Sequence, residues 1–406
     1  MTDVAPADAI SAVHAPKARA PSDAAWPAVL SLALGVFGLV TGEFLPASLL
    51  TPIAGDLGIS NGAAGQSVTV TALVAGIAGP GVVIGAGNVD RKFVVLGLSI
   101  LLILSNLLAA AASSFWMLLV ARIALGVALG AFWSLAAALA LRLVPAHAMP
   151  RAMAVIFTGV SAATVCAAPL GAYFGDLWGW RATFVVAAGI GVLAFLAQLI
   201  TLPKLPPLTA PTLDSFATVL RRPRILVGLA TVILVMSGHF AGFTYVRPFL
   251  EQVPHLGVQM ISLLLLAFGL GGFCGNFAGG LLAERNAKFA VAAGSFVLAL
   301  TAAVLLAFGT SLIVDVIAVA TWGFAFAAFP IGIQTWTTQS APDHAESAGA
   351  LLLTTFQIAI AAGAVVGGVL VDRMGAWGAI GYCSLATLAG GCVMLGFSRG
   401  MKSRQW

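Results

Sequence analysis

Charged residues are scarce in this sequence. Asp, Glu, Lys and Arg together make up 8% of its 406 residues, whereas soluble proteins carry about 25%. So few charges cannot cover a surface that faces water, which excludes a soluble globular protein. Apolar residues make up 60% of the chain, so we expect it to use lipid as its solvent.

Cysteine is also rare, and none of the four cysteine residues belongs to a Cys-x-x-Cys pair. The sequence has no His-Glu-x-x-His segment and no phosphate-binding loop that ends in Lys-Ser or Lys-Thr. We therefore expect no disulfide, no metal, no cofactor and no catalytic residue. The four cysteines lie inside apolar runs as Cys166, Cys274, Cys383 and Cys392.

Long apolar runs are the main feature that is present. A membrane-spanning helix needs about 20 predominantly apolar residues. Barrel strands would instead alternate over roughly ten residues, and that pattern is absent. The sequence therefore predicts an all-α integral membrane protein with twelve spans, at 27–48, 66–87, 93–112, 116–141, 152–174, 182–202, 225–248, 259–283, 289–308, 312–337, 347–371 and 377–397.

A proline-rich segment divides these spans six and six. It contains Pro203, Pro206, Pro207, Pro211 and Pro223, and proline interrupts helices. We interpret it as a linker between two bundles. The expected organisation is a disordered tail (1–25), a first bundle (26–202), the linker (203–224), a second bundle (225–398) and a short tail (399–406).

Basic residues gather in the loops of one side. With a cytoplasmic N-terminus, most of the 19 Lys and Arg residues fall on the cytoplasmic side. We therefore expect a multi-pass protein of the bacterial inner membrane with both termini and the linker in the cytoplasm. Its environment is the lipid bilayer, its net charge of +5 does not indicate nucleic acid, and we expect a monomer.

The two bundles repeat each other. The triad 42–44 (Gly-Glu-Phe) recurs as 238–240 (Gly-His-Phe). At the same offset, Gly171, Asp176 and Gly179 recur as Gly367, Asp372 and Gly375. Parallel repeats of six spans, related by an axis along the membrane normal, are typical of one large class of secondary transporters.

Each copy of the triad places an ionisable side chain within a span, Glu43 in the first and His239 in the seventh. Such groups usually mark a transport pathway. Arg122 in the fourth span lies at a similar depth to Glu43, about 10 Å below the outer surface by helical rise, so we expect these two to pair. The alternatives are a permanent structural ion pair for Glu43 and a hydrogen-bonded packing role for His239. Asp315 is the next candidate for proton coupling.

Several segments resemble motifs of the major facilitator superfamily. Residues 280–288 resemble the loop motif G-x-L-a-D-R-x-G-R-K, with Glu284 in place of Asp, and 90–92 and 368–375 echo it. Arg122, Gly126 and Gly130 are similar to the R-x-x-x-G-x-x-x-G element of twelve-span drug:proton antiporters. Residues 168–171 resemble G-P-x-x-G with Ala first, and 43–58 with 238–251 resemble the arabinose-efflux and purine-ribonucleoside-efflux branch.

This resemblance covers residues 26–400 and implies twelve transmembrane helices in two pseudo-symmetric six-helix bundles. It also implies proton-coupled efflux of a small organic solute, such as a sugar, nucleoside or drug, by alternating access, with a link to drug resistance. Protons and the solute would be its partners. Proton coupling would involve Glu43, Arg122 and His239.

Polar and aromatic residues inside the spans are candidates for solute contacts: Gln357, Asn276, Trp133, Trp322 and Thr354. Their alternative roles are joining helices by hydrogen bonds or anchoring at the membrane interface. The loop residues Asp90, Arg91, Glu284 and Arg285 are candidates for conformational latches, because each pair places an acid and a base at a helix end.

Two further questions stay open at this stage. Arg247 and Glu251 are four residues apart and form either an outer gate or an exposed surface pair. The alternative functions are an importer or uniporter of the same fold, or a membrane-embedded enzyme or sensor. The solute, the direction of transport, the proton stoichiometry and the oligomeric state do not follow from the sequence.

Overall fold

The computed structural model describes residues 24–86, 89–145, 148–205 and 213–396. Within these residues every regular element is a helix, which confirms the predicted all-α class. The two expected tails, 1–25 and 399–406, lie almost entirely outside the described residues, as does the middle of the linker.

Six long helices form the first half of the molecule, and they correspond to the first six predicted spans. In a membrane each such helix satisfies its backbone hydrogen bonds internally, which is why apolar runs of this length become helices. The helices are α1 (Trp26–Ser48), α3 (Asn61–Gly85), α4 (Arg91–Ala110), α5 (Phe115–Leu143), α6 (Met149–Trp178) and α7 (Trp180–Thr201).

Five long helices form the second half: α9 (Pro223–Thr244), α11 (Val258–Phe308), α12 (Leu312–Ser340), α13 (Ala345–Met374) and α14 (Ala376–Gly396). The 51 residues of α11 would extend about 76 Å as one straight helix, more than twice the thickness of a bilayer core. Its backbone leaves the helical region at Asn286, where φ is −160° and ψ is 95°. Helix α11 therefore supplies two spans, and the predicted total of twelve is confirmed.

A short helix follows the first helix of each half, α2 (Leu50–Leu57) after α1 and α10 (Val246–Gln252) after α9. Pro52 and Pro248 explain the breaks between them, because proline lacks the N–H that would bond to the carbonyl four residues earlier. Those carbonyls belong to Ser48 and Thr244, the last residues of α1 and α9. The predicted seventh span, 225–248, therefore ends earlier than expected.

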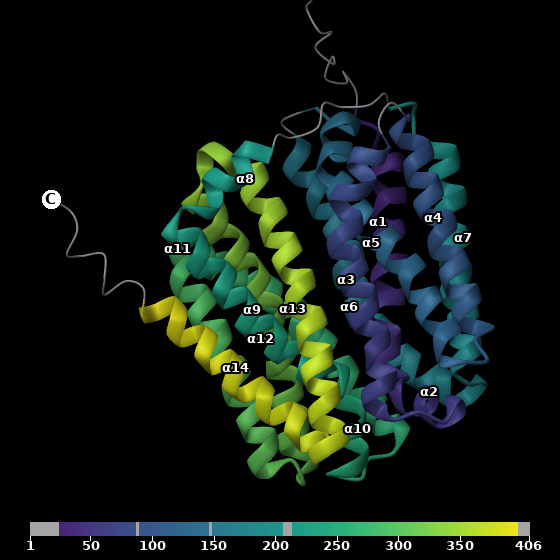
Figure 1. The fold of residues 1–406 in the computed structure, drawn as a ribbon, viewed down its shortest axis with the longest axis vertical. Helices are drawn as coiled ribbons and strands as arrows, with labels where there is room; N and C mark the ends of the chain where they lie inside the picture. The colour runs from purple at the N-terminus through teal and green to yellow at the C-terminus, as the bar shows by residue number, and fades with distance from the viewer. Residues whose placement is uncertain (1–23, 87–88, 146–147, 206–212, 397–406) are drawn as a thin grey trace, which may run out of the picture.

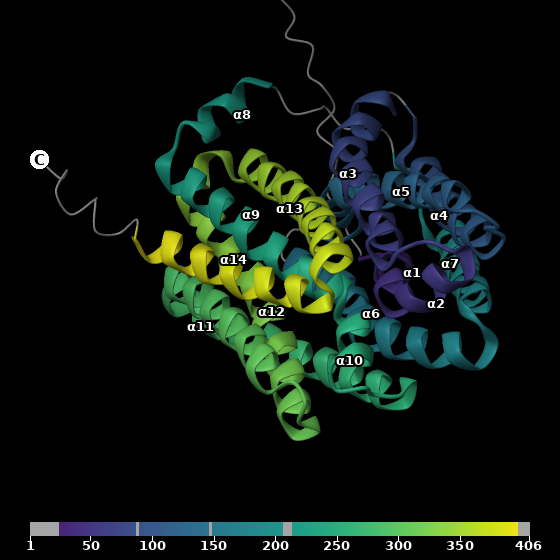
Figure 2. The same ribbon diagram turned by 60° about the horizontal axis from the view of Figure 1, so that its bottom comes forward.

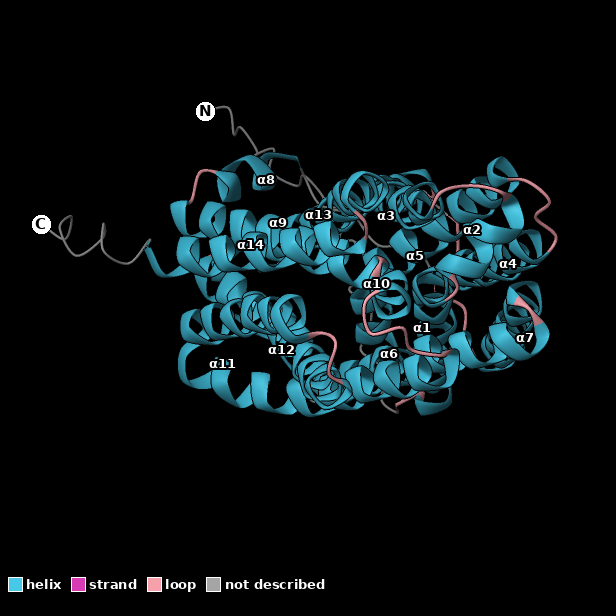
Figure 3. Ribbon diagram, turned by 90° about the horizontal axis from the view of Figure 1, so that it is seen from below, coloured by secondary structure: helices cyan, strands magenta, loops and turns pink. Residues whose placement is uncertain are grey.

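The two halves lie side by side, with α2 and α10 at the bottom of Figure 1 and α8 (Leu213–Leu220) at the top. We call the bottom the α2/α10 end. Helices α4 and α7 lie at the outer edge of the first half, away from the second (Figure 2). The halves meet where α3 packs on α13 and α6 packs on α11, and Figure 3 shows α13 beside α3.

Close packing of α5 on α3 depends on the glycines of the antiporter-like element. A Cβ atom at Gly130 would lie 2.0 Å from the carbonyl oxygen of Ala75, and one at Gly126 would lie 2.6 Å from that of Thr71. Only glycine allows two backbones to approach this closely. The element therefore sets the position of α5, and with it that of Arg122.

Candidate functional site

Glu43 and Arg122 lie near each other, on α1 and α5, but they do not form an ion pair in this structure. Arg122 is 1% exposed, and its Nη1 donates a hydrogen bond of 2.8 Å to the carbonyl oxygen of Gly42. Its guanidinium carbon lies 4.9 Å from the centre of the Phe184 ring. An electrostatic interaction couples it to the partly buried Glu43, whose carboxylate has no hydrogen bond to a described residue.

Arg122 keeps unused donors close to Glu43. Its Nε and Nη2 are buried and have no acceptor among the described residues. A buried guanidinium with unpaired donors is costly, and a planar carboxylate is the group that matches its fork of donors. A change in the position of Glu43 relative to Arg122 would therefore have a large effect on both groups.

His239 lies in a buried aromatic cluster. Trp322 Nε1 donates a hydrogen bond of 3.0 Å to His239 Nδ1, and both side chains are 0% exposed. The Phe326 ring stacks on the imidazole at 3.9 Å between centroids. Since an indole nitrogen can only donate, Nδ1 must be unprotonated, and the neutral imidazole carries its proton on Nε2. Taking up a second proton requires that the bond to Trp322 breaks.

Aromatic side chains connect the two triads across the interface of the halves. Phe44, the residue after Glu43, packs edge-to-face on Phe243 with 5.5 Å between ring centroids. Phe243 in turn stacks on His239 at 5.5 Å. The structure thus brings the repeated triads 42–44 and 238–240 together through Phe44 and Phe243. The sequence repeat identifies the two triads as equivalent positions, but it does not indicate that they are in contact.

The five candidate solute contacts do not form one group. Trp322 belongs to the cluster around His239. Gln357 is buried on α13 beside Gly76 of α3, and Asn276 of α11 donates a hydrogen bond of 3.2 Å to Ser161 of α6. These two amides therefore lie at the two contacts between the halves. Thr354 is partly buried on α13, and Trp133 is partly buried on α5, 5.7 Å from the ring of Phe157.

The candidate latches make no cross-half hydrogen bond among the described residues. Asp90 caps α4 through Lys92 N at 2.9 Å and accepts a second bond of 2.8 Å from Leu205 N. Arg91 is buried and donates to the carbonyl of Val89. These contacts join the α3–α4 turn to the chain that follows α7.

Glu284 and Arg285 are both exposed, and neither forms a hydrogen bond or ion pair with a described residue. Asp315 lies in the first turn of α12 and is completely buried, and its two carboxylate oxygens have no described partner. The described residues contain no group of three or more His, Cys, Asp or Glu side chains that could hold a metal ion.

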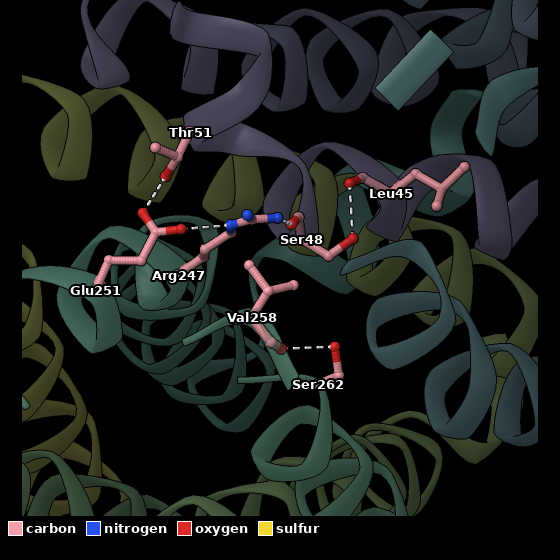
Figure 4. Close-up of polar contacts among 7 residues, drawn as sticks. All are labelled: Leu45, Ser48, Thr51, Arg247, Glu251, Val258 and Ser262. Atoms are coloured by element: carbon pink, nitrogen blue, oxygen red, sulfur yellow. Dashed lines mark hydrogen bonds and ion pairs between the residues drawn. The ribbon is translucent and has the colours of Figure 1, made fainter. Parts of the chain in front are cut away.

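Arg247 and Glu251 form an ion pair of 2.8 Å within α10, and both side chains also bond to the first half (Figure 4). Arg247 Nη1 also donates a 2.6 Å hydrogen bond to the carbonyl of Ser48, and Glu251 accepts one of 2.6 Å from Thr51. The Arg247 side chain is only 6% exposed, so the alternative of an exposed surface pair is wrong. The spacing of four residues predicts the pair itself, whereas its partners in the other half are visible only in the structure.

Comparison with known proteins gives consistent results. Residues 32–364 match the Major Facilitator Superfamily. The chain is 44% identical, over 350 residues, to the purine ribonucleoside efflux pump NepI of Escherichia coli O6:K15:H31 (strain 536 / UPEC), in a match that covers 86% of this chain and 88% of that protein. The protein of the same name from strain K12 is 43% identical over the same shares of the two chains.

Solved structures with the same fold include a bacterial homolog of the human lysosomal transporter Spinster in an inward-facing and occupied conformation. It has a TM-score of 0.74 and 16% identity, and the match covers 93% of this chain and 97% of that one. A mutant of the nucleoside transporter NupG has a TM-score of 0.71 and 15% identity, over 92% of this chain and 100% of that one. These similarities show a shared fold.

Proposed function

Because the chain belongs to the major facilitator superfamily, we propose that it exports a purine ribonucleoside or a closely similar solute in exchange for protons. Membership of this family and the similarity to these relatives identify the chain as a membrane transporter and not an enzyme. The solute is proposed from the name of the relatives, the purine ribonucleoside efflux pumps, which are 43–44% identical to this chain over most of both chains.

The observation that carries the proton part of this proposal is the unpaired state of Glu43 beside Arg122. An arginine at ion-pair distance stabilises a carboxylate, and separation of the two in a low-dielectric site favours the protonated acid. Arg122 holds two unused donors and one bond to the Gly42 carbonyl, so it can bind the carboxylate in another conformation. Glu43 would then gain and lose its proton as α1 and α5 shift relative to each other during the movement of the halves.

We further propose that the α2/α10 end faces the periplasm and that the end with α8 faces the cytoplasm of a bacterium. The support is the excess of Lys and Arg in the loops of the second end, together with the positive-inside rule. In this orientation the contacts of Figure 4 lie at the outer side of the inner membrane.

His239 has a lesser part in this proposal. Its Nδ1 is occupied by Trp322, and it has no acidic partner within ion-pair distance among the described residues. We propose that the His239–Trp322 pair shapes the aromatic wall against which a flat purine base packs, and that Gln357 and Asn276 supply amide groups for its polar edges.

The experiment uses the purified protein in liposomes, with an imposed pH gradient and a radiolabelled purine ribonucleoside. We expect uphill transport that collapses when the gradient is dissipated. Glu43→Gln should reduce gradient-driven transport to the level of protein-free liposomes, yet retain exchange of labelled for unlabelled solute. The control is Asp176→Asn, which changes an exposed acid on α6 and should transport normally.

Each outcome addresses a separate part of the proposal. Full gradient-driven transport by Glu43→Gln would show that another group carries the proton, and Asp315 would be tested next. Failure of the unmodified protein to bind or move any purine ribonucleoside would refute the proposed solute class, whatever the behaviour of the variant.

A further inference from the structure

A carboxylate of one half caps a helix of the other half at the α2/α10 end. Asp372, near the end of α13, accepts a hydrogen bond of 2.7 Å from Ser60 Oγ and one of 3.0 Å from the backbone N–H of Gly62. Ser60 Oγ itself accepts a hydrogen bond of 3.0 Å from the backbone N–H of Ala63. Since α3 begins at Asn61, these contacts lie at its N-terminus and satisfy donors of its first turn.

The physical role of this contact follows from the polarity of a helix. The first N–H groups of α3 have no partner within the helix, and the N-terminus carries a partial positive charge. Ser60 satisfies one N–H from within the same half. The N–H of Gly62 is satisfied from the other half, and the charge that complements the helix dipole also comes from there. This part of the cap exists only while the halves touch.

Small residues make the approach possible. A Cβ atom at Gly62 would lie 2.6 Å from the carbonyl oxygen of Gly368, so a larger side chain there would force α3 and α13 apart. The hydroxyl of the buried Tyr245 lies between them, 2.9 Å from the carbonyl of Ala364 and 3.3 Å from that of Gly62. The contact is therefore a fitted interface that involves α3, α13 and the chain at the end of α9.

A second contact holds the same end. Pro52 leaves the carbonyl of Ser48 without its helical partner, and Arg247 of the other half donates to that carbonyl. Glu251, paired with Arg247, accepts from Thr51 (Figure 4). Because Arg247 remains in place when Asp372 is altered, a change at Asp372 alone should weaken the closed end without destroying it.

The repeat of the sequence offers an internal comparison. Asp176 on α6 occupies the position equivalent to Asp372, is likewise exposed, and forms no hydrogen bond with a described residue. At the α6–α11 contact lies an open pocket of about 390 Å³, lined mainly by apolar side chains such as Pro169, Leu170 and Leu266. Within the part of the chain that the structure describes, the capping contact is thus present on the α3–α13 side and lacks a counterpart at Asp176.

We propose that Asp372 is a movable helix cap: it holds the α2/α10 end closed by capping α3, and α3 loses this cap when the halves part at that end. The proposal concerns the equilibrium between closed and open arrangements. It does not depend on which solute the protein carries or on which residue carries the proton.

The test measures the distance across this end directly. Spin labels are attached to Gly55→Cys on α2 and Gln252→Cys on α10, in a background without the native cysteines. Both positions are exposed, and a Cβ at Gly55 meets no atom within 4 Å. Electron–electron distance distributions are recorded in liposomes without solute.

Asp372→Asn removes the charge but keeps an acceptor for the N–H of Gly62, so it should raise the ratio of long to short distances about threefold, the factor that corresponds to loss of one exposed charge at a helix N-terminus. Ser60→Ala should shift it in the same direction by a smaller factor, because it removes only one donor to Asp372. High salt should reduce the difference between Asp372→Asn and the unmodified protein, since the charge is exposed.

Asp176→Asn is the matched control and should leave the distribution unchanged. An unchanged distribution in Asp372→Asn, or an equal shift in Asp176→Asn, would overturn the proposal. If Asp372→Asn does not fold, Ser60→Ala decides, and an unchanged distribution in that variant also overturns it.

Discussion

The hydrogen bond between Trp322 and His239 should be detectable as a coupling energy. Trp322→Phe removes the Nε1–H donor but keeps an aromatic ring, and it leaves His239 Nδ1 buried and unpaired. His239→Leu removes the acceptor and leaves the indole N–H unpaired. The double variant removes both polar groups, so neither single penalty remains in full.

The magnitude follows from burial. An unpaired buried polar group costs about 1–3 kcal/mol. Measured couplings of hydrogen bonds in membrane proteins average about 0.6 kcal/mol and reach about 1.7 kcal/mol. Both side chains are 0% exposed and their nitrogen atoms are 3.0 Å apart, so we place this bond near the upper limit, at about 1.5 kcal/mol. The destabilisation of the double variant should therefore be smaller, by this coupling energy, than the sum of the destabilisations of the two single variants.

The assay is the free energy of unfolding in mixed micelles, followed by circular dichroism for the four proteins of the cycle. Trp336→Phe is the matched control. Trp336 Nε1 also donates a hydrogen bond of 3.0 Å, to the carbonyl oxygen of Arg224, but its position is partly exposed and water can replace the bond. Its loss should cost clearly less than the loss of Trp322.

Single effects of Trp322→Phe and His239→Leu that simply add, within about 0.3–0.5 kcal/mol, would refute this reasoning. The two groups would then not be bonded in the folded protein. The assignment of His239 as a neutral imidazole with its proton on Nε2 would lose its basis, and His239 would return as a candidate proton carrier.

Three other outcomes are expected. Gly130→Ala would place a methyl group 2.0 Å from a carbonyl oxygen of α3 and should destabilise the bundle by about 3 kcal/mol or more. Gly55→Ala places its methyl group where no atom lies within 4 Å, so it should not destabilise the protein. Thermal unfolding in detergent compares the two variants. The hydrogen bond from Arg222 lowers the pKa of Asp343 to about 2, so the stabilisation from this pair is present above about pH 4 and is lost as the pH falls through 2. Unmodified protein and Asp343→Asn should therefore differ slightly in melting temperature at pH 6 and not below pH 2, and a constant difference would contradict the assignment. A single cysteine at Ser215 should resist impermeant maleimide in intact cells, and ready labelling would reverse the proposed orientation.

The agreement between sequence and structure is greatest for the elements themselves. Hydropathy alone separated the spans that meet at Asn286, even though the helix is nearly continuous there. It worked because a chain in lipid must satisfy its backbone within each span, so length and apolarity decide where helices form. The same local rule explains the breaks at Pro52 and Pro248, although the seventh span was predicted to run past its break.

The family also followed from the sequence, because its motifs lie in short segments whose residues are close in the chain. Its match over residues 32–364 confirms that inference. The depth of Glu43 and Arg122 could be estimated in the same way, since helical rise converts position along a span into depth.

Contacts between the halves were decided only by the tertiary structure. Arg247 and Ser48, or Asp372 and Gly62, are far apart in the chain, and their pairing depends on how two bundles are rotated against each other. Hydropathy carries no information on that rotation, because every face of a helix in lipid can be apolar. Whether Glu43 bonds to Arg122 follows from the packing of α1 against α5 within the first half, and which end of the molecule is closed follows from the packing of the two halves. Both belong to one conformation, whereas the sequence must permit several.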